Sequence, residues 1–253
     1  MRAISLLSLL PLCTAHEWLD DVGADLSCVA SSVDHSKIVV AAVGDSITVG
    51  ATCRTWAGGY VKILSDVLEA AHPGKYDVRD CGLCGHDAVR KGHGNAKHAT
   101  YWDTPAMQNS LSMKPDVVIY MLGTNDADEW YNTSSYFGQD WSDLAGTYVA
   151  LPNKPKVVSM VPPPYGNTTC VGGAGSAANP TCLAPFDKNC VINCLLPKLV
   201  PQLGSKIGLG APLDMLSLFD GPDNTNKTLM PGLHPDCAGY TVMGEYIAKQ
   251  LFE

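Results

Sequence analysis

The sequence predicts an α/β protein, a single-domain three-layer α/β/α sandwich with a five-stranded, mostly parallel sheet. Short apolar runs rich in β-branched residues alternate along the chain with longer segments whose apolar residues recur at helical spacing. This alternation is typical of a parallel sheet covered by helices on both faces. The 253 residues, 46% of them hydrophobic, supply the core of one domain of ordinary size, and neither an internal repeat nor a domain boundary is visible.

The clearest strand is the apolar run from Ile38 to Val43, which has the composition of a strand buried on both faces. A helix should follow it, because apolar residues recur at helical spacing until His72-Pro73-Gly74, which cannot continue a helix. In chain order, the first half is expected to hold an arm over 16–37 on the sheet edge, a strand over 38–43, a helix over 58–71, a strand over 76–81, a surface loop over 89–104, a short helix over 107–113 and a strand over 116–122.

The second half continues the alternation, with more interruptions by proline. Pro162-Pro163-Pro164 ends the fourth strand, and Pro197 and Pro201 interrupt a segment that otherwise has helical spacing. The expected elements are a polar, aromatic-rich stretch leading into an amphipathic helix over 128–150, a strand over 156–161, a long loop over 165–188, an interrupted helix over 190–203, a strand over 212–216 and a last helix over 239–252.

The N-terminus has the three parts of a secretory signal peptide. Arg2 provides the positive start, residues 3–12 the apolar run, and Cys13-Thr14-Ala15 a small-residue cleavage site. A membrane anchor would need roughly 20 apolar residues, and this run is far shorter. We therefore expect residues 1–15 to be a signal peptide, residues 16–253 to form the mature domain, and the protein to be secreted rather than inserted in a membrane.

The cysteines agree with an oxidising compartment. Removal of Cys13 from the ten cysteines leaves nine, of which most should pair and one should be left over. Connectivity cannot be read from sequence, and Cys170 with Cys182 is one pairing that would close the glycine-rich loop between them. Zinc is the alternative at Cys81 and Cys84, but a second CxxC at finger spacing is missing, so no metal is expected. Glycosylation sequons begin at Asn132, Asn167 and Asn226.

A serine follows the first strand in Gly44-Asp45-Ser46, at the position where α/β folds place their chemistry. A plain Gly-Asp-Ser turn is the alternative interpretation. A serine hydroxyl becomes a good nucleophile when a base takes its proton, so Ser46 needs an imidazole. His234 stands in a loop just before the last helix and is the candidate base. His93 and His98 lie in a polar loop and are expected to be solvated, while His86 could line the cleft or lie at the surface.

Four stretches, in this order, resemble the blocks of the SGNH hydrolases, the superfamily of GDSL-type esterases and lipases. GDSIT at 44–48 matches the nucleophile block, and GLCGHDA at 82–88 is similar to the glycine block. YMLGTNDA at 120–127 matches the asparagine block, and GLHPDCAGY at 232–240 matches the histidine block except at its start. The blocks span most of the chain, and the resemblance implies a flavodoxin-like SGNH fold. The run YWDTPAMQNSL followed by KPDVVIYMLGTNDA is most similar to the carbohydrate (sialate-type) acetylesterase branch.

The resemblance also implies roles for individual residues. Ser46 would be the nucleophile and His234 the general base, and the oxyanion would be held by the backbone N–H groups of Ser46 and Gly85 and by the side-chain amide of Asn125. Losing one such donor costs about 3–4 kcal/mol of barrier. Gly85 directly precedes the His-Asp pair of its block and aligns better than Gly82, which fits a tight turn after the second strand. Asn125 could instead cap a helix, and Asp45 is expected to hold the nucleophile loop rather than act as an acid.

One position departs from the family pattern. Where the family usually has an aspartate, three residues before the histidine, this chain has Pro231. Either one acidic residue has been deleted or the base works without it. In a well-studied triad, loss of the acidic member lowers turnover by about 10⁴, which is roughly 5.5 kcal/mol of barrier. A backbone carbonyl could hold the Nδ1 proton instead, and Asp220, Asp223 and Asp236 are candidate orienters, although each also fits a solvated loop carboxylate.

The sequence therefore predicts a secreted serine esterase that removes short acyl groups, acetyl above all, from carbohydrate through an acyl-Ser46 intermediate, without metal or cofactor. The alternatives are a lipase or general short-chain carboxylesterase, and a catalytically impaired SGNH fold that binds glycans. A structural cell-wall protein would fit the cysteines but not the four blocks. The net charge of −8, without a basic cluster, argues against nucleic acid as a partner. Aromatic side chains that could stack on a sugar, or pack in the core, are Tyr101, Trp102, Trp130, Tyr131 and Tyr136.

Overall fold

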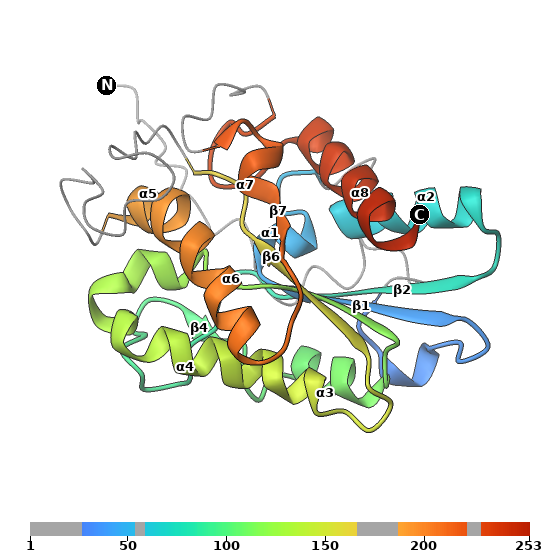
Figure 1. The fold of residues 1–253 in the computed structure, drawn as a ribbon, viewed down its shortest axis with the longest axis horizontal. Helices are drawn as coiled ribbons and strands as arrows, with labels where there is room; N and C mark the ends of the chain where they lie inside the picture. The colour runs from blue at the N-terminus through green and yellow to red at the C-terminus, as the bar shows by residue number, and fades with distance from the viewer. Residues whose placement is uncertain (1–26, 54–58, 166–186, 222–228) are drawn as a thin grey trace, which may run out of the picture.

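The computed structural model describes residues 27–53, 59–165, 187–221 and 229–253 (Figure 1). Its centre is a five-stranded sheet in the order β2-β1-β5-β6-β7, and all four neighbouring pairs run parallel. This is the flavodoxin-like order, which reverses direction between β1 and β5. The predicted architecture is confirmed. The strands are β1 (Ile38–Gly44), β2 (Tyr76–Gly82), β5 (Val117–Met121), β6 (Lys156–Val161) and β7 (Leu213–Asp214).

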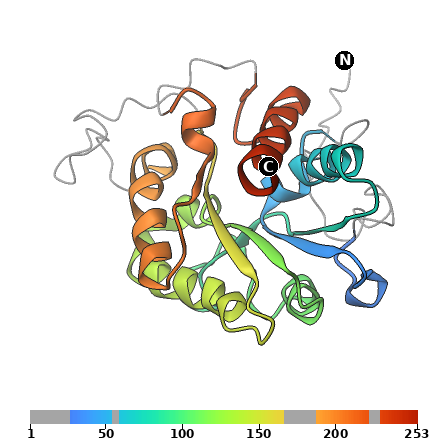
Figure 2. The ribbon, with the colours of Figure 1, turned by 45° about the vertical axis from the view of Figure 1, so that its right-hand side comes forward.

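Helices cover both faces of the sheet (Figures 1 and 2). Successive side chains of β1 enter different cores: Val39 and Val43 belong to one cluster, and Val40 to the other, as the two-residue period of a strand requires. β1 is therefore buried on both faces, as its unbroken apolar run predicts. One face is covered by α2 (Tyr60–Ala71) and α8 (Cys237–Phe252), and the other by α3 (Pro105–Ser112), α4 (Trp130–Val149) and α6 (Leu196–Lys206).

The region before α4 and the strand expected over 212–216 differ most from the prediction. The polar, aromatic-rich stretch expected ahead of α4 belongs to the helix, which begins at Trp130 directly after the 3₁₀ turn η2 (Asp126–Glu129). Trp130, Phe137 and Trp141 lie buried on one face of it, so helical packing accounts for these aromatics. The expected strand over 212–216 is only two residues long as β7, because Asp214 caps α7 (Met215–Leu218) and turns the chain into a helix.

The interrupted helix over 190–203 contains a change of helix type. It comprises α5 (Lys188–Cys190), the π-helical turn η3 (Val191–Leu195) and α6. Pro197 lies in the first turn of α6, directly after the π-helical turn, whereas Pro201 lies inside the helix. The surface loop expected over 89–104 also contains structure, since β4 (Ala99–Thr100) pairs with β3 (His86–Asp87).

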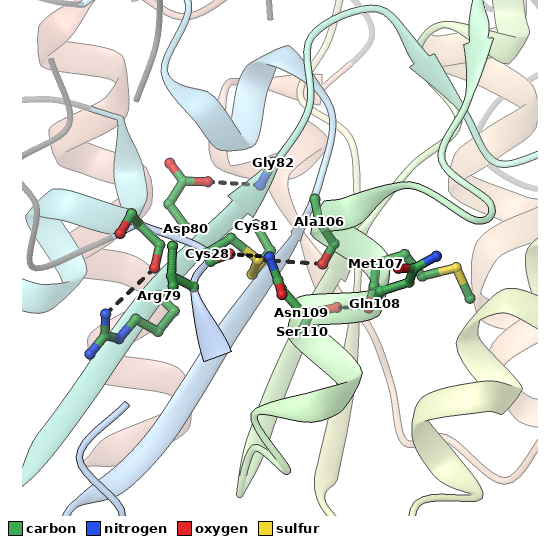
Figure 3. Close-up of a disulfide and its surroundings, with 12 residues drawn as sticks. Cys28, Arg79, Asp80, Cys81, Gly82, Ala106, Met107, Gln108, Asn109 and Ser110 are labelled. Atoms are coloured by element: carbon green, nitrogen blue, oxygen red, sulfur yellow. Dashed lines mark hydrogen bonds between the residues drawn. A yellow bond between two sulfur atoms is a disulfide. The ribbon is translucent and has the colours of Figure 1, made fainter. Parts of the chain in front are cut away.

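Residues 27–37, the described part of the N-terminal arm, lie at the edge of the sheet, where Cys28 is bonded to Cys81 of β2 (Figure 3). Ser27 forms a parallel bridge with Asp80 of the edge strand β2. Next to it, Cys28 and Cys81 form a disulfide with a Cα–Cα distance of 4.9 Å, and Asn109 of α3 donates a hydrogen bond to the Cys28 carbonyl at 2.8 Å. The described part of the arm therefore packs on the sheet edge as predicted, with η1 (Ala30–Ser32) between the bridge and β1.

All seven cysteines in the described ranges are disulfide-bonded, Cys53 to Cys237 among them. The expected pairing of Cys170 with Cys182, the signal peptide over 1–15, and the sequons at Asn167 and Asn226 lie outside the described residues. Asn132 is exposed on α4. Within the described ranges, no helix is both long and apolar enough to cross a membrane.

Candidate active site

Three strands end level with one another at the carboxyl edge of the sheet. Gly44 of β1 is paired with Gly82 of β2 on one side and with Met121 of β5 on the other. The loops that follow these strands carry the nucleophile, glycine and asparagine blocks, so the sheet register brings the three blocks to one place. This is the edge, beside the reversal of strand order, where open α/β sheets bind their ligands.

Ser46 is the first residue of α1 (Ser46–Val49), a single helical turn directly after β1. The carboxylate of Asp45 caps this turn by accepting a hydrogen bond from the Ile47 N–H at 2.9 Å. Asp45 is fully buried, which raises its pKa to about 6. Gly44 has no room for a side chain, because a Cβ would lie 2.1 Å from the Thr48 Oγ1. Asp45 therefore holds the nucleophile turn, as expected from the sequence.

His234 meets Ser46 from the far end of the sequence. The Ser46 Oγ and the His234 Nε2 are 2.8 Å apart, although 188 positions separate them. Burial of the imidazole, together with the nearby cation of Lys188, lowers the pKa of His234 to about 4. The imidazole is therefore neutral at neutral pH, with Nε2 free to take the hydroxyl proton.

The second ring nitrogen of His234 is not held by a carboxylate from the described part of the chain. No carboxylate there contributes to the pKa of His234, and none hydrogen-bonds to its Nδ1. Asp236 instead caps α8, accepting a hydrogen bond from the Gly239 N–H at 2.7 Å. Asp220 follows α7 in a left-handed conformation (φ 66°), and Asp223 lies outside the described residues. The aspartate that Pro231 replaces in the sequence is therefore not substituted by another carboxylate from the described surroundings of the histidine.

Asn125 is buried at the end of the loop after β5, with 4% of its surface exposed. Its Nδ2 donates to the His86 carbonyl at 3.1 Å, which fixes the amide and leaves a second N–H available. Gly85, which directly precedes His86, has φ +66°, a conformation that glycine adopts without strain. The Ser46 N–H, at the first position of α1, has no partner within the helix. The amide and the two peptides predicted to bind an oxyanion thus come from the three neighbouring loops.

Gly82 has a packing role. As the last residue of β2, it lies so close to α1 that a Cβ would be 2.8 Å from the Val49 nitrogen. Its own N–H is held by the Asp80 carboxylate at 2.8 Å. Any side chain at this position would push the nucleophile turn away from the sheet, which agrees with the structural interpretation of Gly82.

Asp126 is a residue that the sequence analysis did not single out. Its carboxylate links the asparagine block to the glycine block. It is fully buried and accepts hydrogen bonds from the Ala88 N–H at 2.9 Å and the Val89 N–H at 3.1 Å. Burial raises its pKa to about 7, and burial together with the neighbouring Asp126 raises the pKa of Asp87 to about 9. Asp126, which directly follows Asn125, therefore ties the loop that carries Gly85 to the asparagine block. Its position next to Asn125 in GTND was the available sequence signal.

Lys188 is a second residue that the sequence analysis missed. Its Nζ pairs with the Asp128 Oδ1 at 2.9 Å, and its side chain is 16% exposed. Asp128 also contacts Lys97 and His98, each at 3.0 Å, and these partners hold the pKa of Asp128 well below its usual range despite partial burial. Burial is the main cause of the low pKa of His234, and the cation of Lys188 lowers it further. The same cation partly offsets the rise that burial causes in the pKa of Asp45. Lys188 follows a long glycine-rich segment, and no motif marks it.

His93 and His98, which were expected to be solvated, each lie against a carboxylate. The Nδ1 of His93 lies 2.6 Å from Asp140, its ring stacks on Tyr136, and His98 is bonded to Asp128. His86 is partly buried, with its Nδ1 2.8 Å from the Cys84 carbonyl. These interactions orient the three rings around the glycine-block loop.

Most of the candidate aromatic side chains pack in the core. Tyr101, Trp102 and Trp130 are buried, and the Trp102 Nε1 donates to the Ala88 carbonyl at 2.8 Å. Tyr131 and Tyr136 are exposed, at 74% and 43%. Within the described ranges, these two remain as candidates for contact with a sugar.

The described residues contain no group of His, Cys, Asp or Glu arranged to hold a metal ion. Cys81, one of the CxxC cysteines, is bonded to Cys28, and Cys84 is also in a disulfide. Neither sulfur is therefore present as the thiolate that a zinc site requires.

A serine hydroxyl thus lies in contact with a neutral imidazole at the carboxyl edge of a flavodoxin-like parallel sheet, an arrangement that can activate the serine as a nucleophile. The sequence model of the GDSL-like lipase/acylhydrolase family matches residues 42–242, and the chain belongs to this family. The match covers all four blocks.

The chain is similar to an acetylxylan esterase from Xylanibacter ruminicola, with 27% identity over 246 residues. These cover 92% of this chain and 47% of the relative, so the chain spans about half the length of the protein it matches. An aryl esterase of M. smegmatis has a TM-score of 0.56 at 20% identity, covering 84% of this chain and 97% of its own. A carbohydrate acetylesterase from Sinorhizobium meliloti has a TM-score of 0.57 at 19% identity, covering 85% and 98%. These two structures share the fold.

Proposed function

We propose that the protein is a secreted serine esterase that hydrolyses short-chain esters, acetyl esters above all, on carbohydrate. The observation that carries the proposal is the 2.8 Å separation of the Ser46 Oγ and the His234 Nε2. The relative from Xylanibacter ruminicola is an acetylxylan esterase, which supports an acetylated polysaccharide as the substrate. The disulfides support an extracellular location, with residues 1–15 as signal peptide and 16–253 as the mature domain.

In the first half of the proposed reaction, the Ser46 Oγ attacks the ester carbonyl carbon while the His234 Nε2 takes the hydroxyl proton. The carbonyl oxygen becomes negatively charged and is held by the N–H groups of Ser46 and Gly85 and by the amide of Asn125. The bond to the sugar oxygen then breaks, and His234 returns its proton to that oxygen. The products are a sugar hydroxyl and an acyl group on Ser46.

In the second half, water attacks the acyl-Ser46 carbonyl, and His234 takes a proton from the water. The same three donors hold the second oxyanion. Its collapse breaks the bond to the Ser46 Oγ, which regains a proton from His234, and acetate leaves. The low pKa of His234 suits this role, because the base must be neutral at the start of each half.

The two alternatives differ from this proposal in measurable ways. A lipase would need an apolar surface for its substrate, and the large exposed apolar side chains of the described ranges are the separate Val29, Tyr131 and Tyr136. A silent glycan-binding protein would need no paired serine and imidazole, so the Ser46–His234 contact favours an enzyme.

Acetate release from acetylated xylan, and hydrolysis of p-nitrophenyl acetate and p-nitrophenyl laurate, test the proposal. We expect the native protein to release acetate from xylan and to prefer the acetate over the laurate ester, and Ser46→Ala to do neither. Equal rates in the native and Ser46→Ala proteins would end the enzyme proposal. A preference for laurate would favour the lipase.

Replacing Lys188 with methionine is expected to move the acidic limb of the pH profile of kcat/KM to higher pH. This limb reports the protonation of the base in the free enzyme. His234 is active when neutral, so its pKa of about 4 keeps the native enzyme active well into the acid range. Removal of a nearby cation raises that pKa, and the enzyme then loses activity at a higher pH.

Lys97→Met is the matched control for this measurement. Lys97 pairs with the same Asp128, but its side chain is 60% exposed and it does not contribute to the pKa of His234. Its profile should therefore superimpose on that of the native enzyme. Identical acidic limbs in Lys188→Met and in the native enzyme would show that Lys188 does not act on the base.

A further inference from the structure

A disulfide joins the segment that carries the nucleophile to the segment that carries the base. Cys53 follows Ser46 by seven positions, and Cys237 follows His234 by three. The two cysteines are bonded, with a Cα–Cα distance of 4.9 Å and a sequence separation of 184 residues. Cys53 is 1% exposed, so the bond lies inside the protein.

Hydrogen bonds continue this connection to the two catalytic residues. On the nucleophile side, the Ala51 N–H donates to the Ser46 carbonyl at 3.0 Å, and the Cys53 N–H to the Gly50 carbonyl at 3.0 Å. Between the segments, the Thr52 hydroxyl donates to the carbonyl of Pro235, the residue directly after His234. An unbroken path of bonds thus runs from the Ser46 backbone to the peptide beside His234.

The base segment is also anchored by its own contacts. The Asp236 N–H donates to the Leu229 carbonyl at 2.9 Å, and the Asp236 carboxylate caps α8. These contacts order residues 229–239 around the histidine, but they do not connect it to the nucleophile. Within the described ranges, the Cys53–Cys237 bond is the covalent cross-link between the two segments.

The need for such a cross-link follows from the missing carboxylate. An aspartate on Nδ1 would normally hold the imidazole in orientation, but Pro231 occupies its place and no described carboxylate acts on His234. The position of the ring then depends on the position of its loop. A misplacement of about 1 Å can cost as much as 10²-fold in rate, so the accuracy of this loop matters.

Resting on the proposed function, we propose that the Cys53–Cys237 disulfide, with the Thr52–Pro235 hydrogen bond, is the positioning device that keeps His234 against Ser46. These residues touch no substrate and act through the base. Their loss should slow proton transfer while leaving the substrate contacts in place.

The chain offers a matched control in Cys28–Cys81. That disulfide has the same Cα–Cα distance of 4.9 Å and connects the N-terminal arm to β2, without either catalytic segment. Disulfide stabilisation through the unfolded chain varies only with the logarithm of loop length, so removal of either bond should lower the thermal midpoint by a similar amount. A difference in turnover between the two variants therefore cannot come from stability alone.

The test compares Cys53→Ala/Cys237→Ala with Cys28→Ala/Cys81→Ala below their unfolding transitions, using kcat and KM for p-nitrophenyl acetate. We expect kcat of the first variant to fall about 10- to 100-fold with KM nearly unchanged. The control should keep kcat within about twofold of the native enzyme. Equal losses of kcat in both variants, or no loss in the first, would overturn the inference.

Thr52→Val keeps the disulfide and covers the case in which the double variant does not fold. It should lower kcat too, though by less, and an unchanged kcat in this variant would also count against the inference.

Labelling of Ser46 by a fluorophosphonate measures activation of the serine without reference to the natural ester. If the native protein is labelled at Ser46, and the Cys53→Ala/Cys237→Ala and Thr52→Val variants are labelled at the same rate, the positioning role is overturned but the proposed function is not. A native protein that neither labels nor hydrolyses acetyl esters would overturn the proposed function and this inference with it.

Discussion

His234→Ala is expected to lower kcat on p-nitrophenyl acetate by about 10⁴- to 10⁶-fold, with a much smaller change in KM. In the proposed mechanism the imidazole takes the Ser46 proton and returns it to the leaving group, so its loss would affect both halves of the reaction. The 2.8 Å contact between the Ser46 Oγ and the His234 Nε2 is the basis of this expectation. Steady-state kinetics, checked against the thermal midpoint of each variant, measure the effect.

The double variant Ser46→Ala/His234→Ala is the appropriate companion to the single variants. Residues that act as a unit show grossly non-additive effects, so the double variant should be about as slow as either single one. Additive losses would mean that Ser46 and His234 act independently, contrary to the observed contact. Activity that survived His234→Ala would contradict the assignment of His234 as the base.

Asn125→Ala is expected to lower kcat by about 10²- to 10³-fold, equivalent to roughly 2.7–4 kcal/mol of barrier. The amide is oriented in advance by the His86 carbonyl, at 3.1 Å, so a second N–H is available to a developing oxyanion without reorganisation. Because charge on the ester oxygen develops in the transition state, KM should change much less than kcat.

Asn109→Ala is the control for this measurement. The Asn109 Nδ2 also donates to a backbone carbonyl, that of Cys28 at 2.8 Å, but from α3 and outside the four blocks. Its removal should cost stability and leave kcat within about twofold. The Asn125 side chain makes no capping hydrogen bond to the turn that follows it, so the helix-capping alternative does not hold. A kcat for Asn125→Ala that matched the Asn109→Ala value would assign Asn125 a structural role, that of holding the His86 carbonyl.

The strands could be predicted from sequence because a strand buried on both faces needs an unbroken apolar run. Ile38–Gly44 and Lys156–Val161 were placed within one residue for this reason. The start of α4 was misplaced because polar residues dominate its first turns, and the buried positions of Trp130 and Phe137 become apparent only when α4 packs on its neighbours. The two-residue β7 was overestimated because Asp214 acts as a helix cap, which an apolar pattern does not reveal.

Most of the candidate site residues could be predicted from local sequence motifs. A serine in GDS and a histidine before a terminal helix are identifiable from their neighbours, and the structure places their side chains in contact. The partners of His93 and His98 could not be predicted, because Asp140 and Asp128 stand 47 and 30 positions away. The polarity of their own loop favoured a solvated state, but in the structure both rings are bonded to these carboxylates.

The sequence alone determined the fold class, the family blocks and the serine and histidine of the site, because these depend on local patterns and on the types of neighbouring residues. Only the tertiary structure decided which cysteines pair, which cation lies near His234, and which carboxylate ties the glycine loop to the asparagine block. Each of these depends on a distance between residues far apart in the chain, such as the 184 positions between Cys53 and Cys237. No local pattern encodes such a distance, because the packing of helices on both faces of the sheet sets it.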